Sequence, residues 1–381
     1  MAPRSLRALA LLTCLGLGAV TATPWLCRRG GDAAWEGDVE THRALAAGVA
    51  RFTDGELGRE DFTTGSALFD GEWLFGTHMM AGMGFGQTAL AHPALRDAHA
   101  PRVARAIDAL LDPAVRAYDT ERHGGEDALA TLEAGEGHVA YLGYMGLVLG
   151  MHRLLEPDGR HAALHDQVAA ALARRLARSP TGLVETYPGE VYPVDNLAAF
   201  GALGLHARAT GADHDALLER FAARLRRDYV DPETGLLVQA TTPDGRRADA
   251  PRGSGTALGA YFASFADAAL SRELHDALRA ELARHHFGFG TVREYPEGTA
   301  GRGDIDSGPI VLGAGLSATG FSLAGARIHG DEAHFRAVHA TATLWGAPRR
   351  FGERAEWVAG GPLGNAILFA MVTARPAREA P

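Results

Sequence analysis

The sequence predicts an all-α protein in which six helical hairpins close into a toroid, an (α/α)6 barrel. Three observations support this prediction. Stretches of helical length rich in Ala, Leu, Arg and Glu fill the chain after residue 35, and the period-2 pattern of strands is scarce. Helices that are apolar nearly all round alternate with amphipathic helices. Turn markers recur at intervals of 52 to 66 residues.

The hairpins are expected to follow one another around the ring. Residues 138–155 are apolar on nearly all sides of a helix, whereas 162–178 carries arginines among its alanines, so the first helix is expected inside and the second outside. A helix near 41–52 would be the outer partner of the last inner helix, so that the two ends of the chain close the ring. The inner helices are expected near 76–91, 138–155, 195–208, 255–268, 310–328 and 362–373.

The turns between paired helices carry residues that end one helix and start the next. Glycines, which favour left-handed backbone, stand beside aspartates suited to helix caps at 158–159, 211–213 and 330–331. Pro93 and the Leu270-Ser271 junction complete the regular spacing. A linear solenoid would have the same spacing, but the segments between hairpins are long and rich in carboxylates and aromatic residues, which favours the toroid.

The composition excludes several kinds of function. The 381 residues are 46% hydrophobic and 22% charged, and the net charge is −9, so we expect no nucleic-acid partner. All 37 basic residues are arginine. Without lysine the chain cannot form a Schiff base, attach pyridoxal phosphate or supply a P-loop lysine. Cys14 and Cys27 form no CxxC pair, which leaves no material for a cysteine zinc site.

The first residues have the pattern of an export signal. Arg4 and Arg7 precede an apolar run that ends on Val-Thr-Ala, the small residues that a signal peptidase needs. Continued to Leu26, the run reaches the length of a membrane anchor. We therefore expect a signal peptide or N-terminal membrane anchor at 1–22, a linker at 23–35 and the toroid domain at 36–375, exported to the periplasm or the extracellular space.

The segment 185–196, between two hairpins, is the richest candidate for an active site. In a toroid such segments gather at one rim of the central cavity. The segment holds Glu185, Glu190 and Asp195, and a pair of carboxyl groups can act as general acid and base. Asp195 opens an inner helix, where an ordinary N-cap is the alternative role. Tyr144, on a neighbouring buried helix, is expected to assist these carboxyl groups.

Further polar and aromatic residues are expected at the same rim. Asp304 and Asp306 stand directly before an inner helix, but the spacing and the closing glutamate of a calcium loop do not follow. The residues expected to contact the substrate are Trp73, His78, His138, Tyr187, Tyr192, Asp304 and Asp306. For such residues the alternative is a structural role in the core, in a helix cap or in a solvated loop.

We expect neither a metal site nor a cofactor. His161 and His165 lie one helical turn apart but lack a third ligand. The glycine-rich stretch 82–86 follows no strand, so close helix packing explains it better than a dinucleotide site. No serine lies in a Gly-x-Ser-x-Gly elbow. The expected partner is a small-molecule substrate held by side chains.

Four stretches of the chain resemble the linalool dehydratase-isomerase family. They are 143–150 (GYMGLVLG), 182–206 with Asp195-Asn196, the Asp-Pro-x-x-Gly turn within 228–235, and 293–306 with its Asp-Ile-Asp. The likeness runs in order from about residue 76 to residue 334. It implies an exported, oligomeric (α/α)6 barrel that acts without a cofactor on a tertiary allylic terpene alcohol.

The chain departs from that family at the site itself. The family uses two cysteines flanking the loop that corresponds to 185–195, and this chain has carboxylates at about those positions. The family's active-site histidine falls at Tyr144, with His138 nearby. Because the chain lacks these cysteines, the family's thiol chemistry is excluded here. A pair of carboxyl groups can still protonate a leaving hydroxyl and take a proton from the adjacent carbon.

Three classes of function remain open at this stage. The first, favoured by the resemblance, is an exported acid/base enzyme of hydro-lyase or isomerase type. The second is a glycoside hydrolase or other carbohydrate-active enzyme, because (α/α)6 barrels commonly host such activities and two carboxyl groups beside an aromatic-lined cleft suit that reaction. The third is a toroid that binds a ligand without catalysis.

Overall fold

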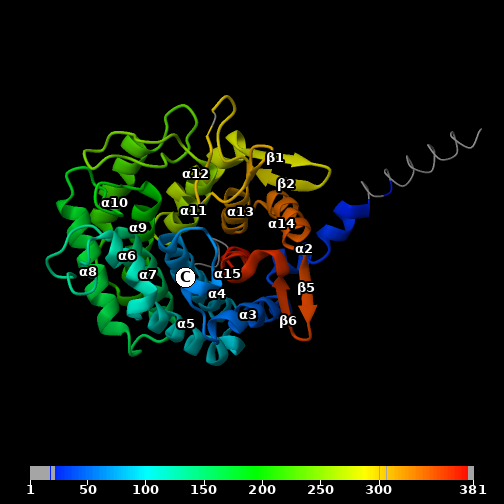
Figure 1. The fold of residues 1–381 in the computed structure, drawn as a ribbon, viewed down its shortest axis with the longest axis horizontal. Helices are drawn as coiled ribbons and strands as arrows, with labels where there is room; N and C mark the ends of the chain where they lie inside the picture. Colours follow the sequence, from blue (N-terminus) through cyan, green and yellow to red (C-terminus); the bar gives the residue numbers. More distant parts are fainter. Residues whose placement is uncertain (1–17, 19–21, 300, 306, 376–381) are drawn as a thin grey trace, which may run out of the picture.

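The computed structural model describes residues 18, 22–299, 301–305 and 307–375. Their helices form an (α/α)6 barrel, which confirms the predicted fold (Figure 1). Six inner helices surround the axis. They are α4 (Ala67–Ala91), α7 (Val139–Leu155), α9 (Pro193–Thr210), α11 (Gly253–Ala263), α13 (Leu316–His329) and α15 (Gly361–Val372).

The ring of inner helices is closed. Each inner helix packs against the next along the chain, and α15 packs against α4. This closure contradicts the solenoid alternative. Six amphipathic helices cover the outside, each antiparallel to an inner partner: α3 (Val39–Thr53), α5 (Arg96–Leu111), α8 (Ala162–Arg178), α10 (Asp215–Arg224), α12 (Ala268–Glu281) and α14 (Glu332–Gly346).

Glycines allow the inner helices to approach one another closely. A Cβ atom on Gly143 of α7 would lie 2.7 Å from the backbone nitrogen of Ala199 in α9. A Cβ on Gly201 of α9 would lie 2.5 Å from the carbonyl oxygen of Phe262 in α11. Only hydrogen fits at such contacts, and this explains why glycine stands at these positions of the inner helices.

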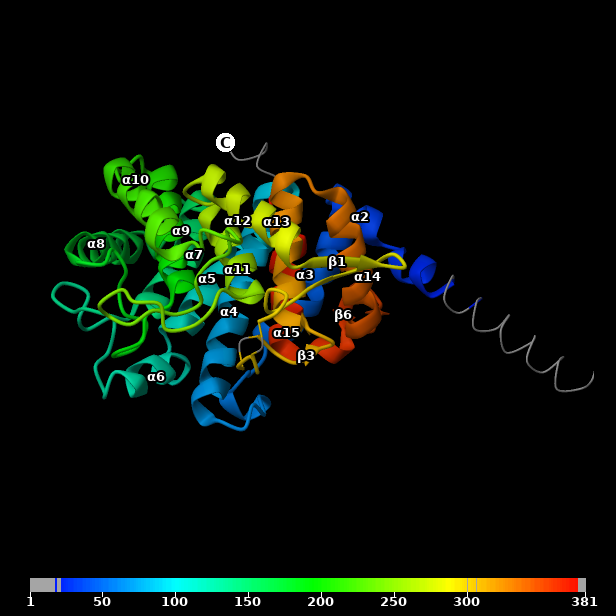
Figure 2. The same ribbon diagram turned by 90° about the horizontal axis from the view of Figure 1, so that it is seen from above.

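Shorter elements decorate the barrel. Helix α2 (Gly31–Glu36) precedes α3, and α6 (Pro113–Arg122) follows α5. Three antiparallel hairpins stand between helices: β1 (Ala283–His286) with β2 (Phe289–Val292), β3 (Ile310–Val311) with β4 (Ala314–Gly315), and β5 (Pro348–Phe351) with β6 (Arg354–Trp357). Ala283 pairs with Val292, Ile310 with Gly315, and Pro348 with Trp357. The view from above places β6 beside α14, on the side opposite α8 and α10 (Figure 2).

Several details of the sequence prediction are wrong. The inner helix expected near 76–91 begins at Ala67, and the one expected near 255–268 ends at Ala263. The inner helix expected from residue 310 begins at Leu316, because Gly313 adopts φ +85° in the tight β3–β4 turn. The Leu270-Ser271 junction lies inside α12, whose true start is capped by the Asp267 side chain. The signal or anchor predicted at 1–22 falls almost wholly outside the described residues. Among the described helices, none is long and apolar enough to cross a membrane.

Candidate active site

A cavity of about 670 Å³ opens at the end of the barrel where the inner helices begin. Its wall is built from the first turns of these helices and from the segments that precede them, as expected for a toroid. The predicted residues that line it are Trp73, Tyr144, Tyr187, Glu190, Tyr192, Asp195 and Asp304. Asp306 lies outside the described residues.

Asp195 is the third residue of α9 and its carboxyl group is buried in this wall. Oδ1 accepts a hydrogen bond from the Tyr144 hydroxyl at 2.6 Å, and Oδ2 accepts one from Thr186 at 2.7 Å. No side-chain cap closes the N-terminus of α9, so the N-cap role is not the one adopted. Burial raises the pKa of Asp195 to about 6, and the two hydrogen bonds act in the opposite direction.

Glu72, in the second turn of α4, brings a second carboxyl group into the same cavity. Burial raises the pKa of Glu72 to about 7; its bond from the Tyr187 hydroxyl lowers the pKa, and repulsion from Asp195 raises it further. Glu72 is not among the site residues predicted from the sequence. A signal was present, because Asp70 and Glu72 are the only charged residues in the 25-residue apolar stretch that forms α4.

Glu190 stands at the mouth of the cavity in a different electrostatic setting. Its carboxylate pairs with the Arg122 guanidinium and accepts a hydrogen bond from the Tyr192 hydroxyl at 3.0 Å. The Arg122 guanidinium also stacks 4.7 Å from the centre of the Tyr187 ring. These contacts suit Glu190 to hold the rim in place, and leave Asp195 and Glu72 as the two desolvated carboxyl groups.

Gln239 and Ser254 also contribute polar side chains to the cavity wall. Gln239 is 6% exposed and its buried Oε1 has no hydrogen-bond partner. The Ser254 hydroxyl donates to Oε1 of Glu294 at 2.5 Å, and burial raises the pKa of that fully buried glutamate to about 7. Asp304, an exposed lining residue, pairs with Arg252.

Three predicted residues do not line the cavity. Glu185 turns back on its own loop, where its carboxylate accepts from the Gly189 backbone N–H at 2.9 Å. His78 is buried in α4, and burial lowers its pKa to about 4. His138 lies behind the cavity wall, with Nδ1 2.7 Å from Oδ2 of Asp119.

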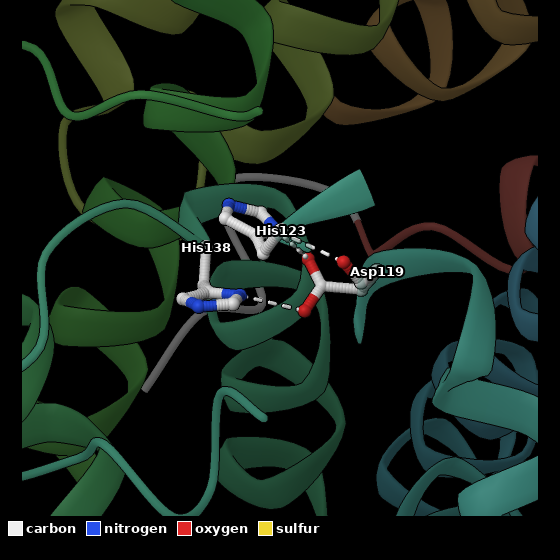
Figure 3. A group of neighbouring side chains, drawn as sticks. All are labelled: Asp119, His123 and His138. Atoms are coloured by element: carbon white, nitrogen blue, oxygen red, sulfur yellow. Dashed lines mark hydrogen bonds and ion pairs between the residues drawn. The ribbon is translucent and has the colours of Figure 1, made fainter. Parts of the chain in front are cut away.

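Asp119, His123 and His138 form the one group among the described residues that has the composition of a metal site (Figure 3). Their ligand atoms lie within 4.8 Å of one another. The two imidazole rings, however, stack 3.6 Å apart at 24°, whereas two histidines that bind one ion must each point a ring nitrogen at it within the ring plane. As arranged, the group is a buried Asp–His hydrogen bond with a second imidazole stacked on it.

Comparison with known proteins supports the fold. No protein-family model matches the chain, and no curated protein sequence does. Among solved structures, the chain is similar to the GH76A alpha-1,6-mannanase from Salegentibacter sp. HEL1_6, with 12% identity, a TM-score of 0.52, and coverage of 90% of this chain and 98% of that one. An inactive variant of that enzyme in complex with alpha-1,6-mannotriose gives 11% identity, a TM-score of 0.53, and coverage of 89% and 99%.

Proposed function

We propose that this protein is an acid/base enzyme that cleaves the C–O bond of a glycoside, with Glu72 and Asp195 as its paired carboxyl groups. The observation that carries the proposal is their shared environment. Each comes from a different inner helix, each is desolvated in the same cavity wall, and each is held by a tyrosine hydroxyl. Glycoside hydrolysis needs two such groups on either side of the scissile bond.

The pKa values divide the roles. At neutral pH Glu72, with the higher pKa of about 7, is protonated in about half of the molecules and can give a proton to the departing oxygen, whereas Asp195, with a pKa of about 6, is mostly ionised. Asp195 then stabilises the positive charge that develops on the sugar ring or activates the attacking water. Because the two groups interact, the pair loses its protons in two linked steps.

The fold adds support to the choice of reaction. Two of the structures that share this barrel are of an alpha-1,6-mannanase, one of them with mannotriose bound. We also propose that the protein works outside the cytoplasm, on the basis of the apolar N-terminal run. The predicted terpene alcohol substrate finds no support in these comparisons.

A lyase or isomerase that acts on an apolar alcohol is the second candidate. The aliphatic residues of the cavity favour it, among them Met80, Leu363 and Ile367. The same two carboxyl groups would serve, one protonating the leaving hydroxyl and the other removing a proton from the neighbouring carbon. The two candidates differ in product, since hydrolysis of a glycoside releases a new reducing end and dehydration of an alcohol releases an alkene.

Two substitutions test the proposal. We expect Asp195→Asn and Glu72→Gln each to lower turnover by about 10²-fold or more, because a positioned proton transfer is lost while size and fold are preserved. Glu185→Gln is the matched control, since Glu185 points away from the cavity and should retain turnover. The measurement is reducing-sugar release from a panel of oligosaccharides that includes alpha-1,6-mannotriose.

Two results would contradict the proposal. One is turnover by Asp195→Asn and Glu72→Gln equal to that of the unaltered protein. The other is the absence of hydrolysis across the whole panel; alkene release from an allylic alcohol would then favour the lyase, and neither product would favour the toroid that binds without catalysis.

A further inference from the structure

The cavity has two chemically different sides. Its polar side carries the carboxyl groups of Glu72 and Asp195 together with Gln239 and Ser254. Its apolar side is supplied by α13, α14, α15 and the deeper turns of α4. Of these, α13, α14 and α15 lie across the barrel from α6, α7 and α9 (Figure 1), whereas α4 packs against α7. This side is lined by Met80, Phe321, Trp345, Leu363, Ile367 and Leu368.

The apolar side offers little to a sugar. None of the described residues that α13, α14 and α15 contribute to the lining is charged. The hydroxyl of Thr319 is already used, since it donates to the Gly315 carbonyl at 2.7 Å and accepts from the Val292 N–H at 3.0 Å. Ser317, at the start of α13, is the other hydroxyl residue of this lining. Away from Ser317, buried sugar hydroxyls would lose their bonds to water without replacement, whereas a hydrocarbon chain would be stabilised by burial.

The apolar side continues to the surface of the protein. Leu316 and Trp345 line the cavity and are 45% and 37% exposed. Leu344, next to Trp345 in the chain, is 46% exposed, and Val358, next to the lining residue Ala359, is 54% exposed. Leu312, in the β3–β4 turn before Leu316, is 100% exposed. Such a surface gives a hydrocarbon chain an apolar route to the interior.

Open space remains within this side. A Cβ atom on Gly364 of α15 would meet no atom within 4 Å, and one on Gly320 of α13 would meet only Leu368 at 3.9 Å. Both glycines line the cavity and lie within helices. Glycine is unfavourable inside a helix, and a larger side chain at either position would meet little steric hindrance. The space left unfilled is therefore suited to a ligand.

We propose that the substrate is an amphiphile, a glycoside with a hydrocarbon tail, which sits with its polar end at Glu72, Asp195 and the unpartnered Oε1 of Gln239 and its tail against α13 and α15. This inference rests on the proposed function for the identity of the polar end. The tail-binding side is independent of that chemistry, so binding and turnover can fail separately.

The test compares octyl and methyl glycosides of the same sugar, glucose or mannose, below the micellar concentration, by calorimetry on the full chain with Asp195→Asn. Each buried methylene strengthens binding by about fourfold, so we expect the octyl compound to bind at least about 30-fold more tightly. Equal affinities of the octyl and methyl compounds, within about threefold, would overturn the inference.

A matched pair of variants locates the tail. Gly364→Leu fills the open space and should weaken octyl glycoside binding by about tenfold or more, whereas Gly364→Ala should preserve it. Neither should lower the melting temperature, because a Cβ atom at this position meets no atom within 4 Å and the cavity lies beyond it. If Gly364→Leu does not fold, Leu363→Asn takes its place, with Phe287→Asn as control, because Phe287 is exposed in the β1–β2 turn and does not line the cavity. Unchanged octyl binding in the folded cavity variant would overturn the inference.

The outcomes also separate the two proposals. Tight octyl binding with no hydrolysis of any glycoside would leave the amphiphile site standing and remove the proposed hydrolase. Hydrolysis of glycosides with no gain in affinity from the octyl chain would support the proposed hydrolase and remove the amphiphile site.

Discussion

Two adjacent residues at the start of α9, Asp195 and Asn196, have different roles. Asn196 holds the preceding loop, since its Oδ1 accepts from the Val184 N–H at 2.8 Å and its Nδ2 donates to the Val184 carbonyl at 3.0 Å. The loop so held carries Thr186 and Tyr187, which bond the two carboxyl groups of the cavity. The Asp195 carboxyl group, by contrast, lines the cavity.

The Tyr144 hydrogen bond sets the charge state of Asp195. The bond lowers the pKa of Asp195, so its removal in Tyr144→Phe should raise that pKa above about 6. We expect the acidic limb of the pH–rate profile to move to higher pH by up to about one unit. Tyr192→Phe is the control, because Tyr192 donates to Glu190. Profiles of the two variants that coincide would argue against a role for Asp195 ionisation in turnover.

The sequence could predict which segments reach the cavity but not which side chains of a segment do. Asp195, Tyr187 and Tyr192 were expected there because toroid loops converge at one rim, and they line it. Glu190 and Glu185 stand in the same loop, yet the turn that pairs Tyr187 with Glu190 sends only one of them to the cavity mouth. Glu72 was missed although the segment 71–80 was expected near the rim, because Trp73 and His78 were chosen from that segment and the inner helix was expected only from about residue 76, whereas α4 begins at Ala67.

At the scale of elements, two glycines of the inner ring have opposite steric surroundings. Gly201 in α9 faces the backbone of α11, where a Cβ would lie 2.5 Å from the Phe262 carbonyl oxygen. Gly364 in α15 faces open cavity. Helix propensity favours alanine at both positions, so steric contact alone decides the sign of a Gly→Ala change.

We therefore expect Gly201→Ala to lower the free energy of unfolding by about 1–3 kcal/mol, the usual cost of overpacking a core. Gly364→Ala should raise it by up to about 1 kcal/mol, because alanine loses less backbone entropy than glycine in a helix. Denaturant unfolding of both variants measures the difference. Destabilisation of equal size at both positions would show that helix packing is looser than the contacts at Gly201 indicate.

At the scale of the whole molecule, the sequence predicted the barrel well because the signal repeats. The predicted inner ranges agree with α7, α9 and α15 to within a few residues and overlap α4, α11 and α13, since each repeat carries the same apolar and amphipathic succession. The β3–β4 hairpin escaped prediction because it has two residues in each strand, too few for a period-2 pattern. The pairing of Glu72 with Asp195 in the cavity was not predicted either, because no local sequence pattern relates α4 to α9.

A second repeat concerns histidine. His92 follows α4 directly, and His152, His206 and His329 stand near the C-terminal ends of α7, α9 and α13. Several contact a histidine of a neighbouring helix or turn, as in the bond of 3.0 Å between the rings of His42 and His92. Close pairs of this kind are compatible with neutral rings and are disrupted when both rings become charged.

These and other buried histidines make stability depend on pH. Burial lowers the pKa to about 3 for His42 and His165 and to about 4 for four others, His78, His99, His329 and His339. The unfolded chain takes up protons at these six positions below about pH 6.5, before the folded chain does. Their contribution to stability is complete above that pH and is lost as the pH falls toward 4.

Three buried carboxyl groups act with the opposite sign. The pKa is raised to about 7 for Glu72 and Glu294 and to about 6 for Asp195, so the folded chain holds protons there that the unfolded chain releases above about pH 4. Their cost to stability is largest at and above pH 7 and diminishes with acidification. Six histidines outnumber three carboxyl groups, so the histidine effect prevails below about pH 6.

We expect the melting temperature to be highest near pH 7 and to fall steeply between pH 6 and pH 4, which thermal unfolding monitored by circular dichroism across pH 4–8 would measure. His165→Gln should flatten the slope, because it removes a buried group that the unfolded chain protonates at higher pH than the folded one. His286→Gln, at the exposed end of β1, is the control and should leave the slope unchanged. A melting temperature constant down to pH 4 would mean that the buried histidines accept protons without unfolding.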